Sequence, residues 1–226
     1  MSVTWTQKHI EMDKKKQFRL VAILVTVLIV IDQVVKIIVK TTMQHGEEIF
    51  VLGDWFRICF IDNKGIAFGM LTGEWMAGTG KVILTLLRIV ASGALAWFLV
   101  RCVRRGTRTP VLIYLSLVLA GAIGNVIDSC FYGLIFSDSY YHVATLFPEG
   151  GGYGKFLQGK VVDMFYFPLF EFDWPQWIPF VGGHHFKFFN AIFNVADACV
   201  TVGVFWMAID QLLKSEKKAS QIEKNA

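Results

Sequence analysis

Charged residues are scarce in this sequence, and nothing in it reads as a long soluble domain. Only 18% of the 226 residues are charged, 54% are hydrophobic, and the mean hydropathy is +0.50. This composition excludes an ordinary soluble domain and is typical of a small polytopic membrane protein. The net charge of +4 is modest, and the basic residues gather at the ends of apolar segments, which argues against a nucleic-acid partner.

Cysteine and histidine are also few, and they lack the spacing of a metal site. The four cysteines include no CxxC pair, which argues against a disulfide or zinc framework, and Cys59 is the candidate for a free thiol outside the membrane. His184 and His185 are adjacent, but no carboxylate spacing completes a ligand set around them. We therefore predict that the protein holds no metal and no cofactor.

Four apolar stretches are long enough to cross a membrane as helices, which takes about 20 residues each. They cover residues 20–39, 82–100, 110–127 and 188–209. Arg88 interrupts the second stretch, and Asp197 is the only acid in the fourth. The sequence predicts one polytopic membrane domain, residues 1–226, with four transmembrane helices.

Basic clusters predict the orientation of these helices. With four spans, all three clusters fall on one side of the membrane, which predicts that both termini are cytoplasmic. The clusters are Lys8, Lys14, Lys15, Lys16 and Arg19 before the first span; Arg101, Arg104, Arg105 and Arg108 between the second and third; and Lys214, Lys217, Lys218 and Lys224 after the fourth.

Two stretches then face outward. Residues 46–74 contain short β-rich runs broken by turn residues, which predict a small β-cradle on the membrane face. Residues 133–187 form an aromatic-rich insertion that suits the membrane interface. Its aromatic side chains serve either as anchors alone or also as substrate contacts, and the sequence favours neither.

Two aspartates lie in apolar surroundings in the second half of the chain, Asp163 in KVVDMFYF and Asp197 in FNVADACV. An acid in such surroundings is costly and is usually kept for function. At 1.5 Å per residue, Asp197 is expected roughly 13 Å inside the outer end of the fourth span. Two close carboxylates would share a proton, so one can protonate a leaving amine while the other activates water. The alternative is structural pairing with a neighbouring helix, which is a stronger competitor for Asp163 than for Asp197.

Further polar residues lie at the ends of the predicted spans. Asp32 and Lys36 are spaced for an ion pair on one helix, and Asn125 and Asp128 share a helix face after Gly121 and Gly124. We expect Asp32, Lys36 and Asp128 to act mainly as structural glue. Asn194 precedes Asp197 by three residues and should share its helix face, whereas Asn63 lies in an outer loop where an ordinary Asx turn is the alternative.

Five fragments occur in an order that resembles the bacterial lipoprotein signal peptidase family, also called signal peptidase II. The fragments are DQVVK, NKGIAFGM, GAIGNVID, VVDM and FNVADACVTVG, and they run from Asp32 to Gly203. The resemblance implies a monomeric aspartyl endopeptidase of the bacterial inner membrane, with its active site toward the periplasm. It implies cleavage of diacylglyceryl-modified prolipoproteins before the lipidated cysteine, with membrane lipids as neighbours. By motif the catalytic pair falls on Asp163 and Asp197, and the supporting residues fall on Asp32, Lys36, Asn63, Asn125, Asp128 and Asn194.

The chain departs from the family pattern at two motif positions. Ser129 stands where the family usually has Arg, which leaves Lys36 as the candidate partner of Asp128, and Met164 stands where it usually has Phe. Longer outer stretches resemble the bacteroidete branch. Two other hypotheses compete with the peptidase: a small proton-coupled transporter or channel with Asp128 and Asp197 as relay residues, and a purely structural membrane subunit. The acids lie toward the outer face and no internal repeat is evident, which favours the peptidase.

Overall fold

Four long helices make up most of the protein. The computed structural model describes residues 12–65 and 78–224. The helices are α1 (Lys14–Thr42), α3 (Thr79–Arg104), α4 (Thr109–Ile127) and α6 (Val195–Lys224). Each is long and apolar enough to cross a membrane, and large apolar side chains such as Ile23, Val90 and Phe205 are exposed along them. This confirms the prediction of a four-helix membrane protein.

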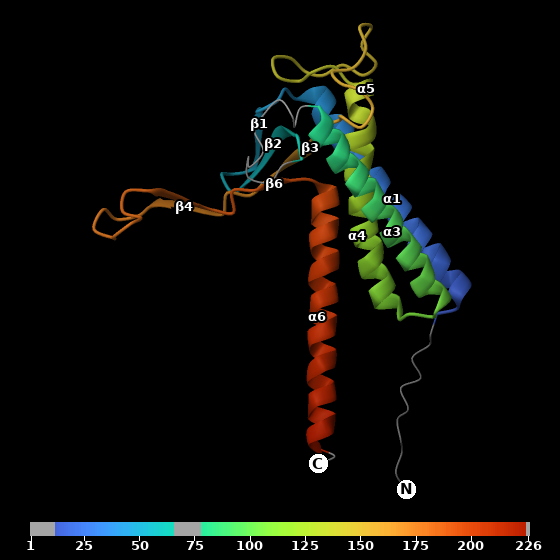
Figure 1. Cartoon of the computed structure of the whole chain (residues 1–226). Helices are drawn as coiled ribbons and strands as arrows, with labels where there is room; N and C mark the ends of the chain where they lie inside the picture. Colours follow the sequence, from blue (N-terminus) through green and yellow to red (C-terminus); the bar gives the residue numbers. More distant parts are fainter. Residues whose placement is uncertain (1–11, 66–77, 225–226) are drawn as a thin grey trace.

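Helix α4 contacts each of the other three long helices. Two glycines of α4 allow it to approach the start of α6 and helix α1 closely. A Cβ on Gly121 would overlap the carbonyl oxygen of Ala196, and one on Gly124 would lie 2.5 Å from Oδ2 of Asp32. Figure 1 shows the start of α1, the α3–α4 turn and the end of α6 at one end of the molecule, with the strands at the other.

Beyond Ile127 the helical backbone continues through a π-helical turn, η2 (Asp128–Tyr132), and a short helix, α5 (Gly133–Ile135). A π turn inside a longer helix is uncommon and often marks a functional region. Here it begins at Asp128, one of the predicted site residues, at the end of the bundle that carries the strands.

A four-stranded antiparallel sheet covers this end of the bundle. Its strands are β1 (Glu48–Leu52), β2 (Phe56–Asn63), β3 (Val161–Tyr166) and β6 (Ile192–Phe193), in the order β1-β2-β3-β6. The predicted β-cradle is confirmed for Glu48–Asn63, and residues 66–74 of it lie outside the described residues. The sheet also takes β3 from the predicted outer insertion, so the two outer stretches form one structure.

The insertion contributes a second sheet, an antiparallel pair formed by β4 (Phe170–Asp173) and β5 (His185–Phe188). Figure 1 shows this pair projecting sideways from the bundle. Aromatic rings of Phe172, Trp174 and Phe186 pack together along it. The predicted start of the fourth span at residue 188 is wrong, because Phe188 ends β5, Ile192 and Phe193 form β6, and the helix begins only at Val195.

Two hydrophobic cores hold these parts together. One lies between α3 and α4 near their connecting turn and includes Leu99, Leu112 and Leu119. The other lies beneath the sheet and joins α1, the strands and the insertion. Met164, which replaces the family's usual Phe, is fully buried in this second core. The departure at this position is therefore a change of core packing.

Candidate active site

Asp163 lies in the middle of β3, with only 3% of its surface exposed. The neighbouring strand β2 ends at Asn63, whose side-chain Nδ2 donates a hydrogen bond of 2.8 Å to Oδ2 of Asp163. Oδ1 of Asn63 accepts a hydrogen bond from the backbone N–H of Gly65 at 2.7 Å. Asn63 therefore ends a strand, and the prediction that it lies in a loop is wrong. It makes the Asx turn that was the alternative to a role in the site, and it also contacts Asp163.

Asp197 is the third residue of α6 and is half-buried. Its backbone N–H donates to Oδ1 of Asn194 at 2.9 Å, and its Oδ2 accepts from the backbone N–H of Asn194 at 3.3 Å. This reciprocal pair is the capping-box arrangement at a helix N-terminus. The expected depth of 13 Å inside a helix is therefore wrong, because the helix starts later than predicted. Asn194 caps α6 and is not a member of its helical face.

Two asparagines connect the aspartates to each other. Nδ2 of Asn194 donates to Oδ1 of Asp163 at 2.7 Å and to Oδ1 of Asn125 at 3.2 Å. Nδ2 of Asn125 in turn donates to Oδ1 of Asp197 at 2.8 Å. Residues from β2, β3, α4 and the start of α6 thus converge on one polar cluster, which we call the dyad cluster: Asn63, Asn125, Asp163, Asn194 and Asp197.

A buried ionic group supports the dyad cluster from α1 and α4. Nζ of Lys36 lies 2.9 Å from Asp32 and 2.8 Å from Asp128, and all three side chains have at most 2% exposure. Nζ of Lys36 also donates to Oδ1 of Asn125 at 2.9 Å. The predicted Asp32–Lys36 pair is confirmed, and Lys36 does pair with Asp128, as expected from the Ser129 departure.

Gln33 belongs to the same group, although we did not predict it. Its Nε2 donates to Asp128 at 2.9 Å and to Asp32 at 3.1 Å, and its Oε1 accepts from the hydroxyl of Tyr132. Its position beside Asp32 in the DQVVK fragment was the available signal. A buried carboxylate needs several donors, so a neighbouring amide is an expected partner.

Arg88 is the second residue that sequence reasoning missed as part of the site. Its Nη1 donates to Oγ of Ser129 at 3.2 Å, and its guanidinium packs against Gly65. Its charge interacts with the carboxylates of Asp197, Asp128 and Asp163. The signal in the sequence was a single arginine inside an otherwise apolar span, where an ionised residue is usually functional.

A separate polar group fixes the end of β2. Nζ of Lys40 donates to Oδ1 of Asp62 at 2.8 Å and to Oγ of Ser139 at 2.9 Å, and both Lys40 and Asp62 are fully buried side chains. Nζ of Lys160 lies 3.7 Å from the other carboxylate oxygen of Asp62. Because Asp62 precedes Asn63, these contacts hold Asn63 in place beside Asp163.

The electrostatics of the dyad cluster separate the two aspartates. Burial raises the pKa of Asp163 to about 7, and the nearby charge of Asp197 acts in the same direction. Hydrogen bonds from Asn63 and Asn194 oppose this rise but do not cancel it. Asp197 lies in the first turn of α6. The environment therefore favours the neutral form of Asp163.

The histidines singled out in the sequence lie elsewhere. His185 is on β5, where its Nδ1 lies 2.6 Å from Asp173. Nδ1 of His184 lies 3.2 Å from the backbone oxygen of Val181. Within residues 12–65 and 78–224, no group of His, Cys, Asp and Glu side chains has a geometry that could hold a metal ion. The four cysteines are free and buried. Cys59 is a free thiol on β2 of the outer sheet, as predicted, but its side chain is buried.

Comparisons with known proteins agree with one another. The family model of signal peptidase (SPase) II matches residues 24–213. The lipoprotein signal peptidase of Porphyromonas gingivalis is 48% identical over 85% of this chain and 83% of its own length. That of Amoebophilus asiaticus is 32% identical over 86% of this chain and 78% of its own length. A solved structure of a bacterial membrane enzyme superposes with a TM-score of 0.53 at 27% identity, covering 85% of this chain and 92% of that one.

Proposed function

The chain belongs to the signal peptidase II family, and we propose that it removes the signal peptide from diacylglyceryl-modified prolipoproteins, cleaving before the lipidated cysteine. The observation that carries the proposal is the dyad cluster. Asp163 and Asp197 reach it from different segments of the chain, and two asparagines join them. The arrangement does not favour a proton-coupled transporter or channel, because its proposed relay residue Asp128 is paired with Lys36 and accepts a hydrogen bond from Gln33.

We assign the general acid to Asp163 and the general base to Asp197. The carboxylate of Asp197 takes a proton from water as the water oxygen bonds to the scissile carbonyl carbon. The carboxyl group of Asp163 gives its proton to the departing amide nitrogen, and the C–N bond breaks. The signal peptide leaves with a new carboxylate, and the lipidated cysteine keeps the new amine. A pKa of about 7 for Asp163 supports this assignment, because an acid works best when its pKa lies near the working pH.

The other polar residues have positioning roles in this proposal. Asn63 and Asn194 hold Asp163 from two sides, and Asn125 fixes Asp197. The ionic group of Asp32, Lys36 and Asp128 holds Asn125 in turn. Catalysis is sensitive to such support, because small displacements of reacting groups cost large factors in rate.

We place the protein in the bacterial inner membrane as a multi-pass enzyme with both termini cytoplasmic. The start of α1, the α3–α4 turn and the end of α6 carry the basic clusters, and they lie at one end of the molecule with the strands at the other (Figure 1). This supports the orientation through the positive-inside rule. The dyad cluster then faces the periplasm. We take the enzyme to act as a monomer, since one chain supplies both aspartates.

Access for the substrate comes from the side in this proposal. A signal peptide helix enters from the bilayer and presents its C-terminal end to the aspartates, while its acyl chains stay in lipid. Strand β1 supports this proposal. Its side chains Ile49, Phe50 and Leu52 are each about half exposed, so they offer an apolar surface beside the end of the bundle that carries the dyad cluster. Because the acyl chains stay in lipid, they hold the precursor at a fixed depth in the bilayer, and this depth sets the register of cleavage at the aspartates.

Cleavage assays with purified protein test this function. Asp163→Asn and Asp197→Asn should each lower turnover of a diacylated prolipoprotein peptide by orders of magnitude, because Asn cannot exchange the proton. Folding is checked by thermal unfolding in the same detergent. The wild-type protein should keep its activity in EDTA and should show a much higher kcat/KM for lipidated than for unlipidated peptide. Near wild-type turnover by either folded variant would reject the dyad, and equal kcat/KM for the two peptides would reject the substrate class.

A further inference from the structure

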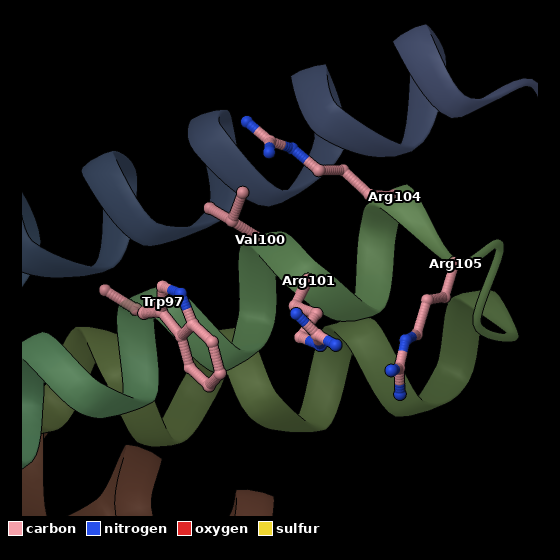
Figure 2. Close-up of a pocket in the computed structure, with 6 residues that line it drawn as sticks. Trp97, Val100, Arg101, Arg104 and Arg105 are labelled. Carbon is pink, nitrogen blue, oxygen red and sulfur yellow. The ribbon is translucent and has the colours of Figure 1, made fainter.

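Three hollows lie at the end of the bundle opposite the dyad cluster, and each shares lining residues with the other two. The first, of about 500 Å³, is lined by Trp97, Arg101, Arg104 and Arg105 on α3 together with Ala96 and Val100 (Figure 2). The second, of about 440 Å³, lies between α1 and α3 and is lined by Lys14, Lys15, Phe18, Arg19, Val103 and Arg104. Neither belongs to the site described above.

The third hollow is an apolar groove of about 220 Å³ between α1 and α3. It shares Ala96 and Val100 with the first hollow, and Phe18 and Val103 with the second. Thr26 is the one polar side chain among its lining residues. The groove therefore leads from the basic residues at the helix ends into the apolar part of the membrane span. A phospholipid has the same order of groups, a charged headgroup followed by an acyl chain.

Arg104 is the residue that joins the two basic hollows. It lines both, and Figure 2 shows its side chain extending from α3 toward the neighbouring ribbon of α1. Arg101 stacks over the ring of Trp97, with its Cζ 5.4 Å from the ring centroid. All the charged side chains that line these hollows are basic. Trp beside Arg is an arrangement suited to the headgroup level of a bilayer.

We propose that this place binds an anionic phospholipid, with its phosphate at Arg104 and one acyl chain in the groove between α1 and α3. Basic residues that only set the topology need to lie on the cytoplasmic side of the membrane, and they need no cavity around them. Here they also surround hollows that open into an apolar groove of the span. Charge and shape together match one ligand class, because a phosphate needs cationic donors and its attached chain needs an apolar path.

Native mass spectrometry of the full-length protein in a neutral detergent tests the proposal. Dioleoyl-phosphatidylglycerol and dioleoyl-phosphatidylcholine are titrated separately. The wild-type protein should bind the anionic lipid more tightly, and Arg104→Gln should weaken that binding about fivefold, since one basic residue near an anionic lipid contributes about that factor. Ala22→Phe, which fills the groove without changing charge, should also weaken binding. Inorganic phosphate at millimolar concentration should not displace the lipid.

Arg108→Gln is the matched control. It removes the same charge from the same end of the bundle, but Arg108 lines none of the three hollows and is paired with Asp210 at 2.7 Å. Asp210 keeps Lys214 as a partner at 2.6 Å, so the control leaves no carboxylate unpaired. Equal losses for Arg104→Gln and Arg108→Gln would overturn the proposal, because they would indicate attraction to general charge. Equal affinity for the two lipids, an unaffected Ala22→Phe, or displacement of the lipid by phosphate would overturn it as well.

Discussion

The pH dependence of cleavage should reveal the proton on Asp163. If Asp163 is the general acid, kcat/KM needs its protonated form, and its pKa of about 7 sets the basic limb of the profile. The sign follows directly: raising pH through about 7 removes the proton and the activity with it. At one unit above this pKa only about a tenth of the enzyme keeps the proton, so kcat/KM at pH 8 should be about tenfold below its plateau.

Asn63→Ala moves that limb in a direction that the structure fixes. Nδ2 of Asn63 donates to the carboxylate at 2.8 Å and favours its charged form, so removing this donor raises the pKa of Asp163 further. A hydrogen bond to a charged group is worth roughly 1.5–3 kcal/mol, of which part is recovered by relaxation, so a shift of about one pH unit upward is expected. The plateau should also fall, because Asp163 loses a positioning contact.

The assay is kcat/KM for a lipidated prolipoprotein peptide in micelles, measured from pH 5 to pH 9. Asn190→Ala is the control, because Asn190 lies in the same outer region and accepts its hydrogen bond from Tyr166, at 3.0 Å, and not from Asp163 or Asp197. It should leave the basic limb in place. A basic limb that stays fixed or moves downward in Asn63→Ala would refute the assignment of the proton to Asp163, as would a flat wild-type profile between pH 6 and pH 9.

Three further predictions follow from the site and the fold. Arg88→Gln should lower kcat/KM roughly tenfold to hundredfold and move the basic limb upward in pH, because it removes a positive charge that interacts with both aspartates. Arg88→Lys should restore most of the rate. An unchanged pH profile in Arg88→Gln would indicate that Arg88 has a packing role only. Lys36→Met should destabilise the protein by about 3–5 kcal/mol in detergent unfolding experiments, because two buried carboxylates lose their partner. Adding Asp128→Asn should recover part of this loss, whereas Lys214→Met, which removes an exposed pair at the same spacing, should cost at most about 1 kcal/mol; similar losses for both lysines would contradict the argument. A reporter fused after Ala226 should be active in the cytoplasm, and periplasmic activity would reverse the proposed orientation.

Hydropathy and charge were sufficient to predict the helices of this protein, but not where the last one begins. Residues 188–193 are apolar and aromatic, and such a short run suits a strand as well as a helix. The structure resolves the ambiguity through pairing, because Ile192 and Phe193 lie opposite Tyr166 and Phe165 of β3. The paired residues lie more than twenty positions apart in the sequence, so no local sequence pattern could reveal this pairing.

The two aspartates were predictable because acids in apolar sequence are rare, whereas their connections were not. Asn125 and Asn194 were chosen for their spacing from Asp128 and Asp197, and the structure instead uses them to link Asp197 with Asp163. Gln33 and Arg88 were missed because one amide or one arginine in a sequence has no partner until the helices are packed. Polar partners across the bundle are a property of the fold, so they follow only once α1, α3 and α4 have been placed.

The residues that we expected to be structural glue also determine where Asp197 lies. A helix begins with backbone N–H groups that have no partner within the helix. Oδ1 of Asp32 accepts one of them, the N–H of Ala196, at 2.9 Å, and Asn194 accepts the next, that of Asp197. Since Lys36 balances the charge of Asp32, the ionic group on α1 fixes the first turn of α6. In the proposed mechanism, structural support and catalysis are therefore not alternatives, because the proposed base, Asp197, is held near Asp163 only while this turn is fixed.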